Sequence, residues 1–301
     1  MRRIVERMLP DGSIMFVCPF HVSLEGLESC ILCRDDEDYD TMVKIIALAA
    51  RRKNVIIIIY AVVSNHCHVA VLAATQEDAD AFGDEIKKVY SMWFSSKYKE
   101  RGKLKDVDVK ALYLDNNWHT RNALAYIPRN ALDNGCNVNE YKWSGYSAMF
   151  NSRKTPSGYR RVSQLSKREK RALMHTGDDL SNVGWLLDKQ GRLVPESICD
   201  NNYLEQAFDN DQAFFLKTVG GQNSAEMKQK LVDLPRKMLP DTEFNKNVND
   251  ISRRWFGAEL PQLTKEKKTR LLPYVFRTSK TTVSQLARAF ELTREEVKEM
   301  L

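Results

Sequence analysis

The order of strand-like and helix-like segments in the first half of the chain predicts an α+β fold. Short β-branched stretches such as residues 55–63 alternate with longer segments whose apolar residues recur every three or four positions. A second observation is that the apolar pattern beyond residue 177 is mainly helical. The sequence therefore predicts a mixed domain over residues 1–150, a basic linker over residues 151–177 and a mainly α-helical C-terminal region over residues 178–301.

The first domain is expected to run as strand, helix, strand, strand, helix, strand and helix. Its strands are predicted at residues 13–22, 55–63, 66–72 and 107–114, and its helices at residues 39–52, 76–98 and 118–132. The acidic run at residues 35–38 precedes the first helix, and acids in a first turn favour the helix dipole, so we interpret it as a helix start rather than a metal site. This order predicts an antiparallel sheet with helices on one face, of ferredoxin-like type.

The end of the chain, residues 281–301, predicts two short helices around a tight turn. Thr282 with Gln285 and Thr293 with Glu296 each fit a capping box. The pattern is typical of a helix-turn-helix. Its second helix is acidic, with three glutamates against two basic residues, so helical packing is favoured over DNA reading. Further helices are expected at residues 202–218, 224–234, 245–256 and 265–275.

Composition indicates a cytoplasmic protein with enough apolar residues to form hydrophobic cores. The chain is 43% hydrophobic, yet no run approaches the roughly 20 apolar residues of a membrane span. The charged N-terminus lacks the apolar run of a signal peptide. Six scattered cysteines are typical of reduced usage, and Cys30 with Cys33 forms a lone CxxC that we interpret as packing rather than a metal site.

The basic charge is concentrated in one segment. Residues 1–150 carry 19 Lys and Arg against 20 Asp and Glu, whereas residues 151–175 hold eight basic residues against one acid. Such a band predicts contact with a phosphate backbone, and a solvated linker is the alternative interpretation. The candidate DNA-binding residues are Arg153, Lys154, Arg160, Arg161, Lys167, Arg168, Lys170 and Arg171.

The candidate metal ligands lie where two β-branched strands meet. A short polar break at Ser64-Asn65 separates the strands, and His66 and His68 open the second one. Because strand side chains alternate faces, the two histidines project from the same side and Cys67 from the other. Neutral imidazole is a common metal ligand, so the pair suits a shared divalent metal. Hydrogen bonding of both rings to backbone or solvent is the alternative.

The expected helix over residues 118–132 offers a nucleophile and a third ligand. Tyr126 and Asn130 are four residues apart and therefore lie on one helical face. A tyrosine that attacks a phosphodiester needs a nearby cation, and an amide oxygen from Asn130 would complete the shell of Mg²⁺ or Mn²⁺. From the residues alone, a tyrosine packed on the sheet is the favoured interpretation. Pro128 predicts that the helix begins near Ala125 or bends between Tyr126 and Asn130.

Three motifs in this order resemble those of the HUH single-tyrosine transposases, in particular the branch associated with repetitive extragenic palindromes. They are His66-Cys67-His68 after a strand, the segment Ala-Tyr-Ile-Pro-Arg-Asn-Ala-Leu-Asp-Asn-Gly at residues 125–135, and Trp143-Ser144-Gly145-Tyr146. The acidic run before the first helix is also similar. The resemblance spans roughly residues 10–150. The sequence departs from the family at Ser64 and Ala131, where proline is usual.

The resemblance implies a mobile-element enzyme that cleaves and rejoins single-stranded DNA. It implies that His66, His68 and Asn130 hold Mg²⁺ or Mn²⁺, and that Tyr126 is the nucleophile. Cleavage in this family gives a 5′-phosphotyrosine link and a free 3′-hydroxyl without ATP, and hairpin DNA usually directs the cut. The number of subunits, monomer or homodimer, stays open, as does whether the tyrosine acts in cis or in trans.

Three other functions are compatible with the sequence. A domesticated, catalytically inactive protein would bind hairpin DNA and keep the fold. Replication initiators and relaxases also use a metal ion and a tyrosine nucleophile, but the sequence has no helicase-like P-loop to support this alternative. A metal enzyme that does not act on nucleic acid is the most remote alternative.

Overall fold

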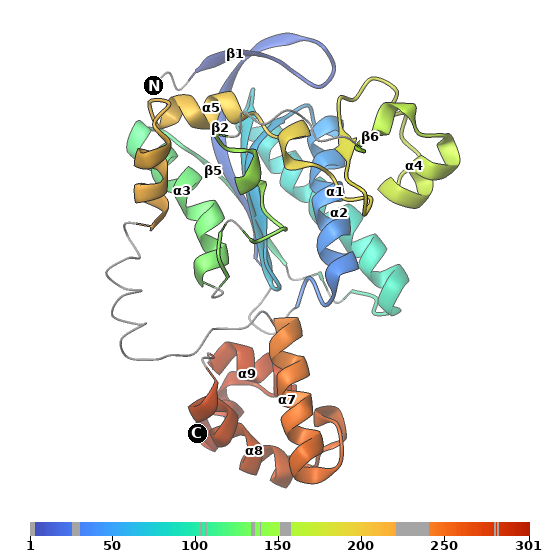
Figure 1. Cartoon of the computed structure of the whole chain (residues 1–301), viewed down its shortest axis with the longest axis vertical. Coiled ribbons are helices and arrows are strands. Elements are labelled where there is room, and N and C mark those ends of the chain that lie inside the picture. The colour runs from blue at the N-terminus through green and yellow to red at the C-terminus, as the bar shows by residue number, and fades with distance from the viewer. Residues whose placement is uncertain are drawn as a thin grey trace.

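The computed structural model describes residues 4–25, 31–102, 104–105, 107–133, 136–138, 140–150, 158–220, 241–279, 281 and 283–301. The fold is α+β, as predicted, and an antiparallel sheet forms its centre (Figure 1). A second, wholly helical unit lies at the C-terminal end of the chain, below the sheet in Figure 1. Among the described residues, no helix is both long and apolar enough to cross a membrane.

The sheet has five strands, and its central pair carries the site described below. The strands run in chain order as β1 (Val5–Met8), β2 (Ile14–Glu25), β3 (Ile56–Val62), β4 (His66–Ala73) and β5 (Asp108–Tyr113). They are ordered β1-β2-β4-β3, with β5 also paired to β2, and every pairing is antiparallel. Runs of isoleucine and valine build β3 and β4, which are buried along almost their whole length.

Helices cover both faces of this sheet. The helices α1 (Asp36–Arg52) and α2 (Gln76–Tyr98) pack on the face that carries Val69 and Val71. The helices α3 (Asn117–Asp133) and α5 (Asn201–Ala207) pack on the opposite face. The prediction of helices on one face is therefore wrong. Helices cover both faces because β3 and β4 are apolar on both sides, and each apolar face must be shielded from water.

The segment that follows residue 157 is folded onto the first core. It contains β6 (Arg160–Arg161) paired with β7 (Leu186–Leu187), the helix α4 (Lys167–Met174), and the short helical turns Val162–Gln164 and Pro195–Ser197. Val162, Leu165 and Met174 belong to the core beneath α1 and α2. Over its described part, the predicted linker is therefore a packed segment. Its few apolar residues are spaced among many basic ones, which hid their packing role in the sequence.

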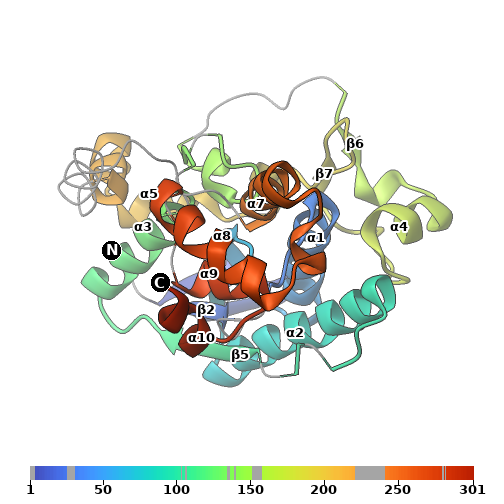
Figure 2. The ribbon, with the colours of Figure 1, turned by 90° about the horizontal axis from the view of Figure 1, so that it is seen from below.

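The described part of the C-terminal helical unit starts at Asp241, whereas the predicted C-terminal region starts at residue 178. It consists of α7 (Asp241–Phe256), the turn Leu260–Gln262, α8 (Lys265–Thr278), α9 (Val283–Phe290) and α10 (Arg294–Met300). These elements share a hydrophobic core of their own, centred on Phe244, Leu271 and Phe290. Figure 2 shows α8, α9 and α10 side by side in this unit.

The helices and capping boxes predicted beyond residue 178 are partly described by the structure. The capping box between Thr293 and Glu296 at the start of α10 is present, as predicted. Thr282 and the helix expected at residues 224–234 lie outside the described residues. The helix expected at residues 202–218 is interrupted, because α5 ends at Ala207 and a second helical segment covers residues 212–220.

Candidate functional site

The two histidines stand at the start of β4, in the middle of the sheet. His68 lies opposite Ser23 of β2 and Ala61 of β3, and it is only 4% exposed. His66 lies opposite Glu25, at the end of the pairing with β2. The two ring centroids are 4.9 Å apart. Both imidazoles therefore lie side by side on the sheet face that α3 covers.

A hydrogen-bonded turn fixes the chain just before His66. The Val63 N–H donates to the carbonyl of His66 at 2.9 Å. The carbonyl of Ser64, which is 5% exposed, accepts from the N–H groups of Leu32 and Cys33 at 2.7 and 2.9 Å. The turn is thus held both within itself and by the segment that leads into α1, which gives the first histidine a defined position.

Asn130 reaches the histidines from α3, and its amide is oriented by the helix itself. Its Nδ2 donates to the carbonyls of Tyr126 and Ile127 at 3.0 and 3.1 Å. Its Oδ1 consequently points to His66 Nε2, at 3.1 Å. The Asn130 side chain is 3% exposed. The structure thus brings together His66 and Asn130, which are 64 residues apart in the sequence.

The atoms of His66 and Asn130 that face each other are suited to a small divalent cation. Asn65 Oδ1 lies 2.8 Å from His66 Nδ1 and, as an acceptor, requires the proton on that nitrogen. In a neutral His66 with its proton on Nδ1, the lone pair of Nε2 faces the Asn130 Oδ1 oxygen. Two neighbouring ligands of an octahedral Mg²⁺, each at about 2.1 Å, are separated by about 3.0 Å. The observed spacing of 3.1 Å matches that separation.

An amide ligand would be needed for such a site. Among the residues that the structure describes, no group of three or more His, Cys, Asp and Glu side chains is placed to hold a metal ion. A cation at the two histidines would therefore need a ligand of another type, and the amide oxygen of Asn130 is the one that lies beside His66. These residues would hold the cation, which would supply positive charge beside a substrate phosphate.

His21 is a third histidine at this site, and the sequence analysis did not single it out. It lies on β2, and its Nε2 is 3.1 Å from Nδ1 of His68. Burial lowers the pKa of His21 to about 4. Burial, together with the neighbouring His66 and His21, lowers the pKa of His68 to about 2. Both rings are therefore neutral near pH 7, the form in which imidazole binds metals.

Tyr126 completes the group from the exposed side of α3. Its ring centroid lies 5.2 Å from that of His68 and 6.3 Å from that of His21, both in edge-on geometry. The side chain is 38% exposed, so a large substrate can reach it. These ring contacts are also compatible with the alternative, a tyrosine whose ring packs on the sheet with its hydroxyl outward. Tyr126 lies over the histidines with access to solvent.

The helix that carries these residues continues through Pro128. It spans Asn117–Asp133, which confirms the helix predicted over residues 118–132 and excludes the alternative start near Ala125. Pro128 lies inside the helix, where a proline cannot donate to the carbonyl four residues earlier. The side chain of Asn130 adds two hydrogen bonds to main-chain carbonyls in the same turn. Tyr126 and Asn130 consequently remain on one helical face.

The predicted basic band is only partly described. Arg153 and Lys154 lie outside the described residues. Arg160, Arg161, Lys167, Arg168 and Arg171 are exposed, on β6 and α4. Lys170 is 9% exposed and packs within the fold, so its assignment to a DNA-binding surface is wrong. The band runs over the α4 side of the molecule, whereas α3 lies across the sheet (Figure 1).

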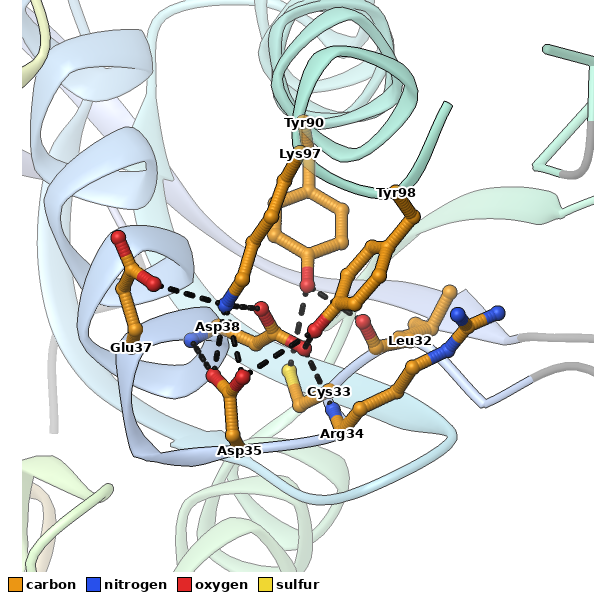
Figure 3. Close-up of polar contacts among 9 residues, drawn as sticks. All are labelled: Leu32, Cys33, Arg34, Asp35, Glu37, Asp38, Tyr90, Lys97 and Tyr98. Atoms are coloured by element: carbon orange, nitrogen blue, oxygen red, sulfur yellow. Dashed lines mark hydrogen bonds and ion pairs between the residues drawn. The ribbon is translucent and has the colours of Figure 1, made fainter. Parts of the chain in front are cut away.

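A buried polar cluster supports the segment that holds the histidine turn (Figure 3). Asp38, fully buried, accepts from Lys97 Nζ at 2.7 Å, from the Tyr98 hydroxyl at 2.7 Å and from the Arg34 N–H at 2.6 Å. Burial alone would lower the pKa of Lys97, but the hydrogen bonds that its ammonium donates to Asp35, Asp38 and Glu37 outweigh burial and raise that pKa. The cluster ties residues 32–38 to the end of α2.

The acidic run in this cluster acts as a helix start, as predicted. Asp35 is the N-cap of α1 and accepts from the N–H of Asp38. The Tyr90 hydroxyl donates to the carbonyl of Leu32. Since the Leu32 N–H is bonded to Ser64, the cluster is linked to the turn before His66 through one residue.

The tryptophans Trp118 and Trp143 have different environments. Trp143 is 7% exposed and stacks on Tyr39 with ring centroids 5.4 Å apart, so it is a packing residue. Trp118, at the start of α3, is 68% exposed and is accessible to a ligand.

Comparison with known proteins gives one distant structural match. No protein-family model matches the chain, and no curated protein matches it. Among solved structures, a REP-associated tyrosine transposase bound to a REP hairpin is similar, with 16% sequence identity and a TM-score of 0.34. The match covers 42% of this chain and 76% of that one.

Proposed function

We propose that the protein is a metal-dependent single-stranded DNA endonuclease and strand transferase of the HUH tyrosine transposase type. The observation that carries the proposal is the convergence of His66 and Asn130 at 3.1 Å, with His68 and Tyr126 beside them. The strand order β5-β2-β4-β3 with its two crossing helices supports a ferredoxin-like core for this domain.

In this mechanism, the residues of the chain position a phosphodiester against Tyr126. A divalent cation held by His66, His68 and Asn130 would bind the non-bridging oxygens of the phosphate and neutralise developing charge. The tyrosine oxygen forms a bond to phosphorus as the bond to the 3′-oxygen breaks, and the hydroxyl proton ends on that oxygen. The products are a 5′-phosphotyrosine and a free 3′-hydroxyl, which attacks the phosphotyrosine in the reverse sense to rejoin strands.

The natural partner in this proposal is single-stranded or hairpin DNA in the cytoplasm. The exposed cations Arg160, Arg161, Lys167, Arg168 and Arg171 are candidates for phosphate contacts. Exposed Trp118, at the start of the helix that carries the nucleophile, is placed to stack on an unpaired base. A dimer and a trans arrangement of Tyr126 are compatible with the proposal.

The test is the covalent adduct. A labelled hairpin oligonucleotide incubated with Mn²⁺ is expected to give a protein–DNA adduct that survives denaturing electrophoresis. Tyr126→Phe is expected to abolish it. Tyr113→Phe is the matched control, since Tyr113 is 37% exposed and lies on β5. Adduct formation by Tyr126→Phe at the level of the wild type would contradict the assignment of the nucleophile.

A catalytically silent DNA-binding protein is the second candidate. It predicts retained hairpin binding, no adduct, and little change in binding on His66→Ala. Binding and adduct formation measured on the same hairpin therefore separate the two functions.

A further inference from the structure

The C-terminal unit carries a basic and aromatic face on α8. This helix has five basic residues and one acid, a net charge of +4, whereas α10 has two basic residues and three acids. Leu271, Leu272 and Val275 point into the core of the unit. Tyr274 packs partly against the same core, whereas the basic residues Lys267, Arg270 and Arg277 of α8 are exposed.

Three cations and one aromatic residue form a stripe along α8. Lys267, Arg270, Tyr274 and Arg277 follow one another at spacings of three, four and three residues, which places them on one helical face. The three cations are exposed. From Lys267 to Arg277 the stripe extends about 15 Å, which matches roughly four nucleotides of a stacked strand at 3.4 Å each.

An exposed tryptophan borders the stripe. Trp255, at the end of α7, is 45% exposed, and its ring centroid lies 4.5 Å from that of Tyr274. Lys267 Nζ lies 5.7 Å from the centre of the neighbouring Phe256 ring. Cations beside an accessible indole form the combination that binds phosphates and stacks unpaired bases.

Two cations of the stripe, Lys267 and Arg270, differ from other cations of the same unit in their ion pairing. Arg253 pairs with Glu259, and Lys265 pairs with Glu296 at 3.1 Å. Within the part of the chain that the structure describes, neither Lys267 nor Arg270 enters a salt bridge. In Figure 1, α8 also lies at the lower end of the unit, away from the sheet. The face is accessible, and two of its cations, Lys267 and Arg270, are exposed and outside the salt bridges of the described residues.

We propose that this α8 face, formed by Lys267, Arg270, Tyr274, Arg277 and Trp255, is a binding site for single-stranded DNA. It is separate from the site at Tyr126 and does not depend on the proposed chemistry. This face is on α8. A helix-turn-helix would instead use its second helix, the acidic α10, to contact DNA. The face binds the backbone through its cations and one or more bases through the indole.

The test is the salt dependence of DNA binding by the full chain. Tyr126→Phe protein with a chelator binds a labelled single-stranded oligonucleotide without cleaving it, and anisotropy gives the affinity at several salt concentrations. Removing two phosphate contacts with Lys267→Ala and Arg270→Ala is expected to reduce the slope of log K against log salt by about 1.4. Trp255→Leu is expected to weaken binding about 5- to 150-fold, and circular dichroism checks that it folds.

The matched control removes two exposed cations from other faces of the same unit, Lys246 and Lys298. Lys246→Ala with Lys298→Ala is expected to leave the slope unchanged. An equal change in both double variants, or none in either, would overturn the proposal. Weaker binding of the Lys267 and Arg270 variant to polyglutamate, with an unchanged DNA slope, would also overturn it and indicate an acidic protein partner. The adduct assay at Tyr126 reports separately on the proposed enzyme activity.

A second and independent inference concerns His21, and it rests on the proposed metal site. If His68 binds a metal through Nε2, that nitrogen must carry a lone pair, and the proton must then lie on Nδ1. The only group that an observed hydrogen bond places at His68 Nδ1, among the described residues, is Nε2 of His21 at 3.1 Å. The geometry points to His21 as a positioning residue that accepts this proton and holds His68 in its ligand tautomer.

This role predicts a measurable change in metal affinity. Outer partners of a metal-binding histidine typically contribute 10- to 100-fold to affinity, so His21→Leu is expected to weaken Mn²⁺ binding by about that factor. His21→Gln retains an acceptor and is expected to recover part of the loss. His119→Leu is the control, because His119 is an exposed histidine on α3 that pairs with Asp115 rather than with the candidate site. Nitrogen-15 NMR is expected to show the Nδ1–H tautomer of His68 in the wild type and a tautomer mixture in His21→Leu.

Failure of this inference can be told apart from failure of the proposed function. If His68→Ala abolishes Mn²⁺ binding and His21→Leu leaves both affinity and tautomer unchanged, His21 has no positioning role. If His68→Ala binds Mn²⁺ like the wild type, the metal site itself is wrong.

Discussion

Replacing Asp38 by alanine is expected to lower the free energy of unfolding by about 3–5 kcal/mol, the usual cost of removing one partner of a buried ion pair. Asp38 is 0% exposed, and its carboxylate accepts from Lys97, from the Tyr98 hydroxyl and from the N–H of Arg34, all within 2.7 Å. Without it, these donors lose a buried acceptor (Figure 3). At about 2–4 °C per kcal/mol, the melting temperature of the sheet domain should fall by roughly 6–20 °C.

The matched control is Glu37→Ala. Glu37 pairs with the same Lys97 Nζ at 2.9 Å, but its side chain is 61% exposed, so its loss should cost less than about 1 kcal/mol. Thermal unfolding followed by calorimetry and near-ultraviolet circular dichroism measures both variants. Equal melting temperatures for Asp38→Ala and Glu37→Ala would refute the argument that burial sets the strength of this cluster. The C-terminal unit, which has its own core, supplies an internal reference transition.

Two further predictions concern the sheet and its histidines. Burial holds the pKa of His21 at about 4 and that of His68 at about 2, against about 6.5 in the unfolded chain. Between pH 6.5 and 4 the unfolded state binds more protons, so stability in chelator should fall as pH falls, by up to about 1.4 kcal/mol per pH unit for each ring. Urea denaturation at pH 7, 6 and 5 measures this, and an equal slope in His21→Leu would contradict it. Gly145→Ala should destabilise by about 1–3 kcal/mol, because its Cβ would meet Cys199 Sγ at 3.1 Å. Gly177→Ala, which meets nothing within 4 Å, is the control in the same thermal assay, and equal melting would contradict the packing argument.

Much of the sheet and half of the site could be predicted from local pattern. Period-two alternation placed His66 and His68 on one side of a strand, and helical spacing placed Tyr126 and Asn130 on one face of a helix. His21 was missed because its role depends on the register between β2 and β4, in which it lies opposite Ala70. Register joins residues that are far apart in the chain, and no local pattern in a single sequence reports it.

Both corrections concern apolar residues whose packing partners lie far away in the sequence. The isoleucine run of β3 was correctly predicted as a strand, but its burial on both faces was not used, so α3 was expected on the same face as α1 and α2. Conversely, Val162, Leu165 and Met174 were outnumbered by basic neighbours, and their segment was predicted to be a linker. In the structure those three residues are between 0% and 8% exposed. A few well-spaced apolar residues are enough to fold a charged segment onto an existing core.

The position of α3 across the sheet from α1 and α2 brings the residues of the candidate site together. The His66 and His68 side chains project to the face that carries Ala61 and Ala70, which is the face that α3 covers. Had every helix packed with α1 and α2, as predicted, the histidines would face solvent without Asn130. The two-sided covering of β4 therefore places Asn130 beside His66, buries His68 and leaves Tyr126 partly exposed. Burial of the candidate ligands and access to the candidate nucleophile follow from this one feature of the fold.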